Sequence, residues 1–100
     1  MDKKLLKQLE ALQQKLLRAQ EEFEKMEFEG SAGGGAVRII ITGRYEVKKV
    51  EIAPEVVNSE DAELLEDLVA AAANEALSRL RERMSRDLEN LGAELGFLLR

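Results

Sequence analysis

The chain has 100 residues and a formal net charge of −5, with 15 basic against 20 acidic side chains. This length predicts a single domain, and the acidic balance excludes a protein that coats nucleic acid by bulk positive charge, because phosphate binding needs a local excess of Lys and Arg. The absence of Cys and His excludes disulfides, thiol nucleophiles, imidazole acid–base chemistry and the usual zinc sites, so we expect no cofactor and no metal.

The first predicted element is a helix over residues 3–26. Its apolar residues are spaced alternately by four and three positions: Leu5, Leu9, Leu12, Leu16, Ala19, Phe23 and Met26. This heptad seam predicts a helix about 36 Å long that packs on a partner helix. The alternative is an ordinary amphipathic helix lying on a core, because about three heptads is short for a coiled coil.

Residues 27–53 change from helical to strand periodicity. Apolar residues alternate along two segments, 37–42 and 47–52, on either side of a turn at Gly43. Phe28 is assigned to a short strand before the glycine-rich stretch. The predicted unit is therefore a three-stranded antiparallel sheet with tight hairpins.

A second helix is predicted from about residue 60 to residue 91. Pro54 ends the sheet, Asn58 or Ser59 caps the helix, and Gly92 stops it. Small side chains allow this helix to lie close to the sheet along an inner stripe of Leu65, Val69, Ala72, Ala73, Ala76 and Leu80. Because such a helix is about 48 Å long and a compact domain of this size has a radius of gyration of only about 13 Å, it must project.

The projecting half of the second helix remains amphipathic. An arc of about 80° contains Leu77, Leu80, Met84, Leu88 and Leu91. Either the first helix or a second subunit must cover this leucine stripe, because soluble monomers rarely expose large apolar patches. We therefore expect an obligate homodimer.

Basic residues form the candidate binding faces of both helices. On the second helix, a narrow face roughly opposite the leucine stripe carries Arg79, Arg83 and Arg86. On the first helix, the side away from the seam carries Lys3, Lys4, Lys7 and Arg18. Arginine suits phosphate because its planar fork donates two parallel hydrogen bonds. The alternative is a solvated surface with i,i+4 ion pairs, Glu75–Arg79 and Glu82–Arg86.

Charge is unevenly distributed along the chain. Residues 54–77 contain seven acidic residues and no basic residue, so a phosphate backbone should contact the molecule elsewhere. If the helices do not provide the contact, the sheet offers a second basic surface with Arg38, Arg44, Lys48 and Lys49.

Two features that resemble catalytic or cofactor motifs have simpler interpretations. The glycines at 33–35 are not a P-loop, because Lys-Ser/Thr and a helix would have to follow, whereas residues 36–38 read Ala-Val-Arg and begin a strand. Glu63 and Asp67 are i,i+4 neighbours on a helix without a pocket or an orienting polar group. We expect neither an enzyme nor a small-molecule substrate. No signal peptide pattern and no apolar run of about 18 residues is present, which predicts a soluble cytoplasmic protein without membrane contact.

Two segments carry a resemblance to a known family. Residues 47–54 read Val-Lys-Lys-Val-Glu-Ile-Ala-Pro, and residues 64–76 read Leu-Leu-Glu-Asp-Leu-Val-Ala-Ala-Ala-Ala-Asn-Glu-Ala. Together with the order of elements, they resemble the YbaB/EbfC family of bacterial nucleoid-associated proteins. The resemblance implies one α+β domain over residues 1–100, with a long N-terminal helix, a three-stranded antiparallel sheet and a long C-terminal helix. It also implies a tweezer-like homodimer whose sheets join at the centre.

The resemblance further implies DNA binding, through the projecting helices, by a protein of the cytoplasm and nucleoid. By position, the residues that the resemblance implies as DNA contacts are Lys3, Lys4, Lys7, Arg18, Arg79, Arg83 and Arg86. Such contacts to phosphate carry little sequence selectivity. The alternative is a dimeric protein-interaction scaffold with incidental DNA affinity, and a steep salt dependence of DNA binding separates the two hypotheses.

Overall fold

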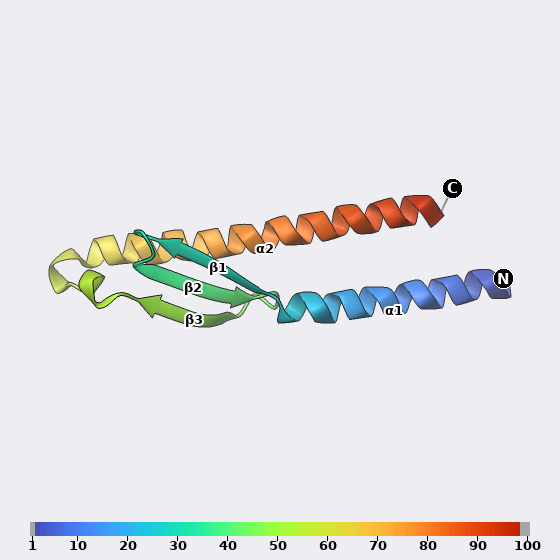
Figure 1. Ribbon diagram of the computed structural model, residues 1–100, viewed down its shortest axis with the longest axis horizontal. Helices are drawn as coiled ribbons and strands as arrows, with labels where there is room; N and C mark the ends of the chain where they lie inside the picture. The colour runs from blue at the N-terminus through green and yellow to red at the C-terminus, as the bar shows by residue number, and fades with distance from the viewer. Residues whose placement is uncertain (1, 99–100) are drawn as a thin grey trace.

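The computed structural model describes residues 2–98 (Figure 1). In chain order, the elements are α1 (Lys3–Lys25), β1 (Glu27–Ala32), β2 (Val37–Thr42), β3 (Val47–Ile52), the 3₁₀ turns η1 (Pro54–Val56) and η2 (Ser59–Asp61), and α2 (Ala62–Leu98). The three strands form one antiparallel sheet in the order β1-β2-β3. The α+β fold predicted from the sequence is confirmed.

The molecule is elongated, with extents of 70 × 21 × 16 Å and a radius of gyration of 19.9 Å. A compact chain of this length would have a radius of gyration of about 13 Å. Figure 1 shows the reason for this elongation: α1 and the far half of α2 extend side by side from the same end of the sheet. We call residues 27–80 the head, and α1 together with residues 81–98 the arms. The predicted projection of the long helix is confirmed.

The core lies between one face of the sheet and the first half of α2. Its buried apolar side chains, each at most 4% exposed, are Val37, Ile39, Ile41, Ala72, Ala76 and Leu80. Every second residue of β2 is buried, as its alternating sequence predicts. The alanines of α2 allow a very close approach: a Cβ built on Gly30 of β1 would lie 2.0 Å from the carbonyl oxygen of Ala72. Helix and strand therefore pack backbone to backbone here.

The predicted C-terminal end of the second helix is wrong, whereas its N-terminal end lies close to the predicted place. Gly92 does not stop α2, which continues to Leu98. A glycine terminates a helix when it adopts the left-handed conformation, and within residues 2–98 the glycines with positive φ are those at 33–35. At the other end, Asn58 caps η2, where its side chain accepts a hydrogen bond from the amide of Glu60 at 3.0 Å. Beyond Leu98, Leu99 and Arg100 lie outside the described residues.

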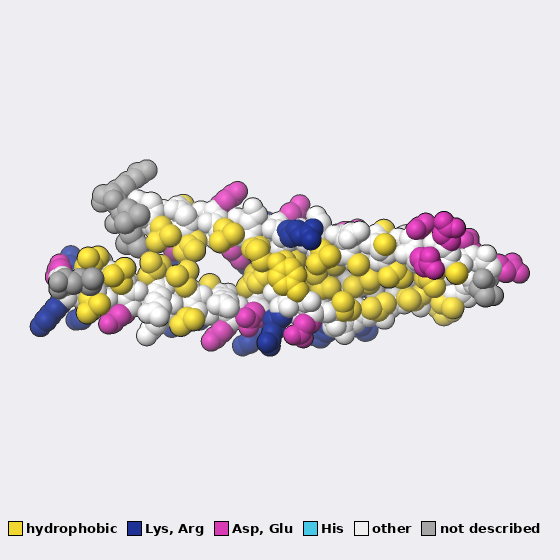
Figure 2. All heavy atoms as spheres, turned by 180° about the vertical axis from the view of Figure 1, so that it is seen from behind, with side chains coloured by type: hydrophobic (Ala, Val, Ile, Leu, Met, Phe, Trp, Pro, Cys, Tyr) yellow, Lys and Arg dark blue, Asp and Glu magenta, His cyan; other side chains and the backbone are white. Residues whose placement is uncertain are grey.

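The apolar seams of the arms and of β3 are uncovered within one chain. No residue of α1 is buried, and Leu9 of its heptad seam is 47% exposed. On β3 the apolar alternation predicted from the sequence is present, but α2 packs on β1 and β2 and leaves Val50 and Ile52 exposed. Figure 2 shows apolar side chains gathered over the head and continuing along both arms. The single chain thus presents an apolar band that it does not cover itself.

Candidate nucleic-acid interface

Helix α1 carries the largest local excess of positive charge. Residues 3–18 contain five basic residues and one acidic residue. The helix begins at Lys3 because the side chain of Asp2 caps it, accepting a hydrogen bond from the amide of Lys4 at 3.2 Å. Of the five basic residues in this segment, four are exposed and form no ion pair within residues 2–98: Lys3, Lys4, Lys7 and Arg18. Their charge is available to an anionic ligand.

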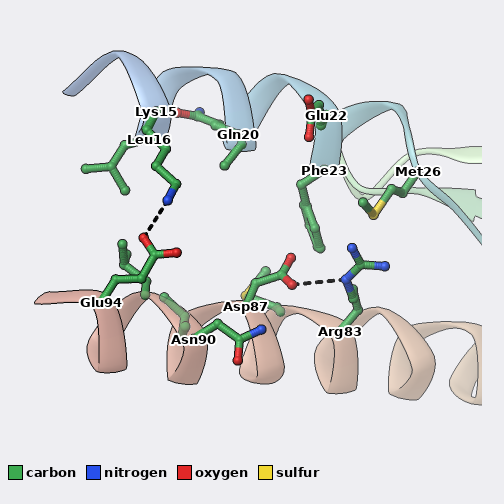
Figure 3. Close-up of a pocket in the computed structure, with 14 residues that line it drawn as sticks. Lys15, Leu16, Gln20, Glu22, Phe23, Met26, Arg83, Asp87, Asn90 and Glu94 are labelled. Atoms are coloured by element: carbon green, nitrogen blue, oxygen red, sulfur yellow. Dashed lines mark hydrogen bonds and ion pairs between the residues drawn. The ribbon is translucent and has the colours of Figure 1, made fainter. Parts of the chain in front are cut away.

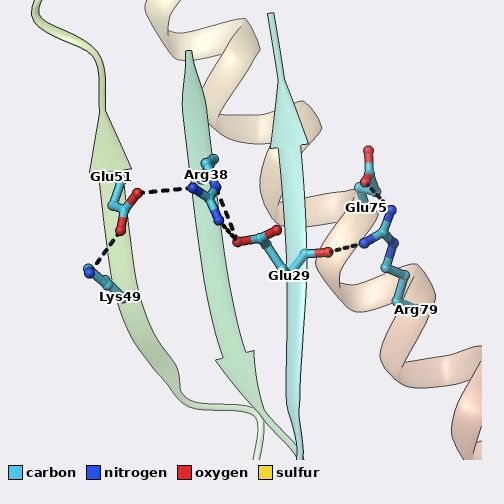
Figure 4. Close-up of polar contacts among 6 residues, drawn as sticks. All are labelled: Glu29, Arg38, Lys49, Glu51, Glu75 and Arg79. Carbon is cyan, nitrogen blue, oxygen red and sulfur yellow. Dashed lines mark hydrogen bonds and ion pairs between the residues drawn. The ribbon is translucent and has the colours of Figure 1, made fainter. Parts of the chain in front are cut away.

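Arg79 of α2 is engaged by the head. Its guanidinium donates a hydrogen bond to the backbone carbonyl of Glu29 at 3.0 Å and pairs with Glu75 at 3.0 Å (Figure 4). The predicted Glu75–Arg79 pair is confirmed. Because Arg79 ties α2 to the edge strand β1, a phosphate would have to compete with two existing partners for it.

Arg83 lies differently from its predicted place. Instead of facing away from the leucine stripe, it points into the space between the arms and pairs with Asp87 at 3.0 Å (Figure 3). The helical wheel places Arg83 about 60° from Leu80, near enough for its long side chain to turn toward α1. Arg86 is exposed and forms no ion pair within residues 2–98, so the predicted Glu82–Arg86 pair is absent from this part of the chain.

Arg81 is an exposed arginine of the α2 arm that the sequence interpretation missed. On the helical wheel it falls beside Leu77 and Leu88 of the leucine stripe, so it did not join the arginine face. Residues 81–98, which form the α2 arm, hold three basic and four acidic residues. The α2 arm therefore carries no excess of positive charge, whereas the outer half of α1 is cationic.

A groove of about 470 Å³ separates the two arms. Apolar side chains from both helices line it, including Leu16, Phe23 and Met84, and the ion pair Lys15–Glu94 spans it with 2.7 Å between nitrogen and oxygen (Figure 3). No group of three or more potential metal ligands occurs within residues 2–98. The groove is thus a gap between two amphipathic helices, bridged at the surface by exposed charges.

The outer face of the sheet carries cations that are each matched by a carboxylate. Arg38 of β2 lies between Glu29 and Glu51, and Glu51 in turn pairs with Lys49 at 2.8 Å (Figure 4). The hydrogen bond and charge of Glu29 raise the pKa of Arg38, and Lys49 lowers the pKa of Glu51. Lys48 is paired with Glu27 at 2.6 Å. This surface is a charge ladder without excess positive charge.

The two ends of the molecule have opposite charge. The acidic segment at residues 54–77 forms the end opposite the arms, where η1, η2 and the start of α2 lie (Figure 1). The unpaired lysines lie near the free end of α1. No helix in the described part of the chain combines the length and the apolar character that a membrane span requires.

Comparison with known proteins gives consistent matches. Residues 1–95 match the model of the YbaB/EbfC DNA-binding family. A nucleoid-associated protein of Dictyoglomus turgidum is 45% identical over 86 residues, which cover 86% of this chain and 83% of the relative. Another, of Xylella fastidiosa, is 42% identical over 99 residues and covers 95% and 91% of the two chains. The crystal structure of an uncharacterized protein from Helicobacter pylori superimposes with a TM-score of 0.75 at 21% identity, over 91% of this chain and 97% of that one, which supports the fold.

Proposed function

The chain belongs to the YbaB/EbfC DNA-binding family, and from this premise we propose that it binds DNA in the bacterial nucleoid as a homodimer. Contact is made with phosphates through the cationic faces of the arms, with weak sequence selectivity. The family is one of DNA-binding proteins, and its relatives carry the name of nucleoid-associated proteins, so we propose no enzymatic role.

The observation that carries the proposal is the charge of α1. Residues 3–18 of this helix include four exposed cations that form no ion pair within residues 2–98, on a chain whose net charge is −5. A phosphate contact needs such a local excess, because the release of condensed counterions drives the binding. Of the seven residues proposed from the sequence, we rank Lys3, Lys4, Lys7, Arg18 and Arg86 above Arg79 and Arg83, which would first have to leave their ion pairs.

The uncovered apolar band supports the proposed dimerisation. Leu5, Leu9 and Leu16 of the α1 seam are each more than 40% exposed in the single chain. Exposed apolar area on this scale marks an interaction surface. A two-fold related copy would cover it and would also double the number of cations offered to one DNA molecule.

Salt dependence tests the proposal. The affinity for a 30-base-pair duplex is measured between about 50 and 200 mM salt for the natural chain and for a variant with Lys3→Gln, Lys4→Gln and Lys7→Gln. Because the slope of log affinity against log salt falls by about 0.9 for each lost phosphate contact, the variant should bind more weakly and show a flatter slope. The matched control is Lys48→Gln with Lys49→Gln, which removes paired cations of the sheet and should change neither quantity.

The alternative outcomes have defined meanings. A loss confined to the sheet variant would place the DNA on the charge ladder. An absence of DNA binding in the natural chain at low salt would favour the protein-interaction scaffold, because the α2 arm lacks excess positive charge and the apolar groove could hold a protein partner.

A further inference from the structure

The hairpin between β2 and β3 holds the one tyrosine of the chain in an unusual conformation. Tyr45 has φ of 62°, in the left-handed region that bulky residues rarely adopt. In such a short hairpin, this position ordinarily belongs to Gly or Asn. A strained non-glycine residue on a surface turn is a reason to look for a function of its side chain.

The turn fixes the position of Tyr45 firmly. Its amide donates to the carbonyl of Thr42 at 3.0 Å, and the amide of Thr42 donates to Glu46 at 2.9 Å. The turn is also attached to the base of α1: Gly43 donates to the carbonyl of Met26 at 3.0 Å, and a Cβ at Gly43 would lie 1.9 Å from the carbonyl oxygen of Phe23. The backbone that carries the tyrosine is therefore held by its neighbours.

The side chain of Tyr45 nevertheless remains 57% exposed. It contributes nothing to the core described above, and its neighbour Arg44 is also exposed, with only a long 3.8 Å contact to Glu46. The hairpin lies at the end of the sheet from which both arms extend (Figure 1). DNA lying along α1 toward the head would therefore arrive at this hairpin.

We propose that Tyr45 stacks on a nucleobase of the bound DNA. Every base has a flat π face, so stacking adds affinity without selecting a sequence, in keeping with weakly selective binding. The base is either unpaired in a single strand or exposed at a duplex step that a side-chain wedge opens. This inference rests on the proposed DNA-binding function and adds to it a contact that is aromatic rather than ionic.

The composition of the chain provides a direct probe. With one Tyr and no Trp, the protein's intrinsic fluorescence comes from Tyr45 alone. Tyrosine emission is followed while a 30-base-pair duplex or a 15-nucleotide oligo-dT is added, and binding is followed separately by the anisotropy of labelled DNA. Stacking predicts that emission is quenched in step with binding. Quenching by oligo-dT alone identifies an unpaired base, and quenching by the duplex as well identifies a wedge.

Two variants separate stacking from a structural role. Tyr45→Gly should weaken DNA binding about 5- to 150-fold, the range for loss of one stacked base, while raising the melting temperature because glycine suits the positive φ. Tyr45→Phe keeps the ring and should bind like the natural chain. The control Val57→Ala removes an equally exposed apolar side chain, 62% exposed, at the other end of the sheet and should change nothing.

The outcomes distinguish this inference from the function on which it rests. DNA binding without any change of emission, or with unaltered affinity in Tyr45→Gly, would overturn the stacking contact and leave the phosphate contacts of the arms intact. An absence of binding in the anisotropy measurement would overturn the DNA-binding function itself.

Discussion

The head and the arms of this molecule are built from similar amphipathic patterns but differ in what their apolar faces pack against. In the head, the apolar faces of β2 and α2 meet each other, and the six apolar side chains that are buried among the described residues lie there. In the arms, no residue of α1 and none of residues 81–96 is buried. The same kind of periodicity therefore forms a closed core in one region and an open surface in the other.

This difference shows where a single chain covers its own apolar surface and where it does not. The head closes because alanines and glycines let helix and sheet approach at backbone distance. The arms diverge from the sheet with a groove between them, so their apolar seams stay uncovered within one chain, which is the surface we propose a second copy covers. Their polar faces, which carry the cations, remain free for a ligand. The following changes test this division.

The largest effect is expected at the closest contact of the head. Gly30→Ala would place a methyl group 2.0 Å from the carbonyl oxygen of Ala72 and 2.4 Å from the amide nitrogen of Ala76. Because neither backbone atom can move aside without unpacking α2, we expect a loss of more than about 3 kcal/mol of folding free energy, the upper end of overpacking effects. Thermal denaturation followed by circular dichroism measures it. As control, Gly34→Ala adds strain in open space (φ +67°) and should cost about 1–2 kcal/mol.

The next effect concerns the seam of α1. If a second copy covers this seam, Leu12→Ala should cost about 2–5 kcal/mol, as for other buried leucines, and should dissociate the dimer at micromolar concentration. Sedimentation and denaturation at several protein concentrations measure both quantities. A natural chain that sediments as a folded monomer, or a Leu12→Ala variant as stable and dimeric as the natural chain, would show that the seam faces solvent.

A smaller effect is expected for the bridge across the groove. Lys15 and Glu94 form an exposed ion pair, with side chains 62% and 48% exposed, and such pairs contribute about 0.2–1 kcal/mol. Lys15→Ala should therefore change stability only slightly, and a double-mutant cycle with Glu94→Ala should give a coupling in the same range. A coupling of several kcal/mol would mean that the groove is closed and dry in solution.

The smallest effect is expected on the charge ladder of the head. Lys49 lowers the pKa of Glu51 from its ordinary value near 4.5, so the folded state favours the ionised carboxylate. This contribution is complete above the unfolded pKa and disappears as the pH falls through the lower folded value. The stability difference between the natural chain and Glu51→Gln should therefore shrink below pH about 4.5. A difference that is constant from pH 7 to pH 3 would contradict the assignment.

The sequence predicted the head better than the arms, for physical reasons. Alternation along β2 and the alanine stripe of α2 depend on neighbours within the same chain, and both were read correctly. Gly92 was misread because a helix tolerates a glycine at a cost of about 1 kcal/mol when nothing requires a left-handed residue there. The direction of the Arg83 side chain could not be predicted, because a long flexible side chain at this position can either extend into solvent or pair with Asp87. The strained backbone of Tyr45 could not be predicted from the sequence either. The turn after residue 42 could equally have been a longer loop, which would not require a left-handed residue at position 45.

Site-specific crosslinking tests the central claim, that DNA lies on the cationic face of α1, most directly. The chain contains no cysteine, so a photoactivatable label can be placed at single positions: Ala11→Cys, which lies among the α1 cations, and Ala71→Cys, an exposed position in the acidic segment. With a bound duplex and illumination, we predict crosslinks from position 11 and none from position 71. Crosslinks from position 71, or none from position 11 while DNA is fully bound, would contradict the account.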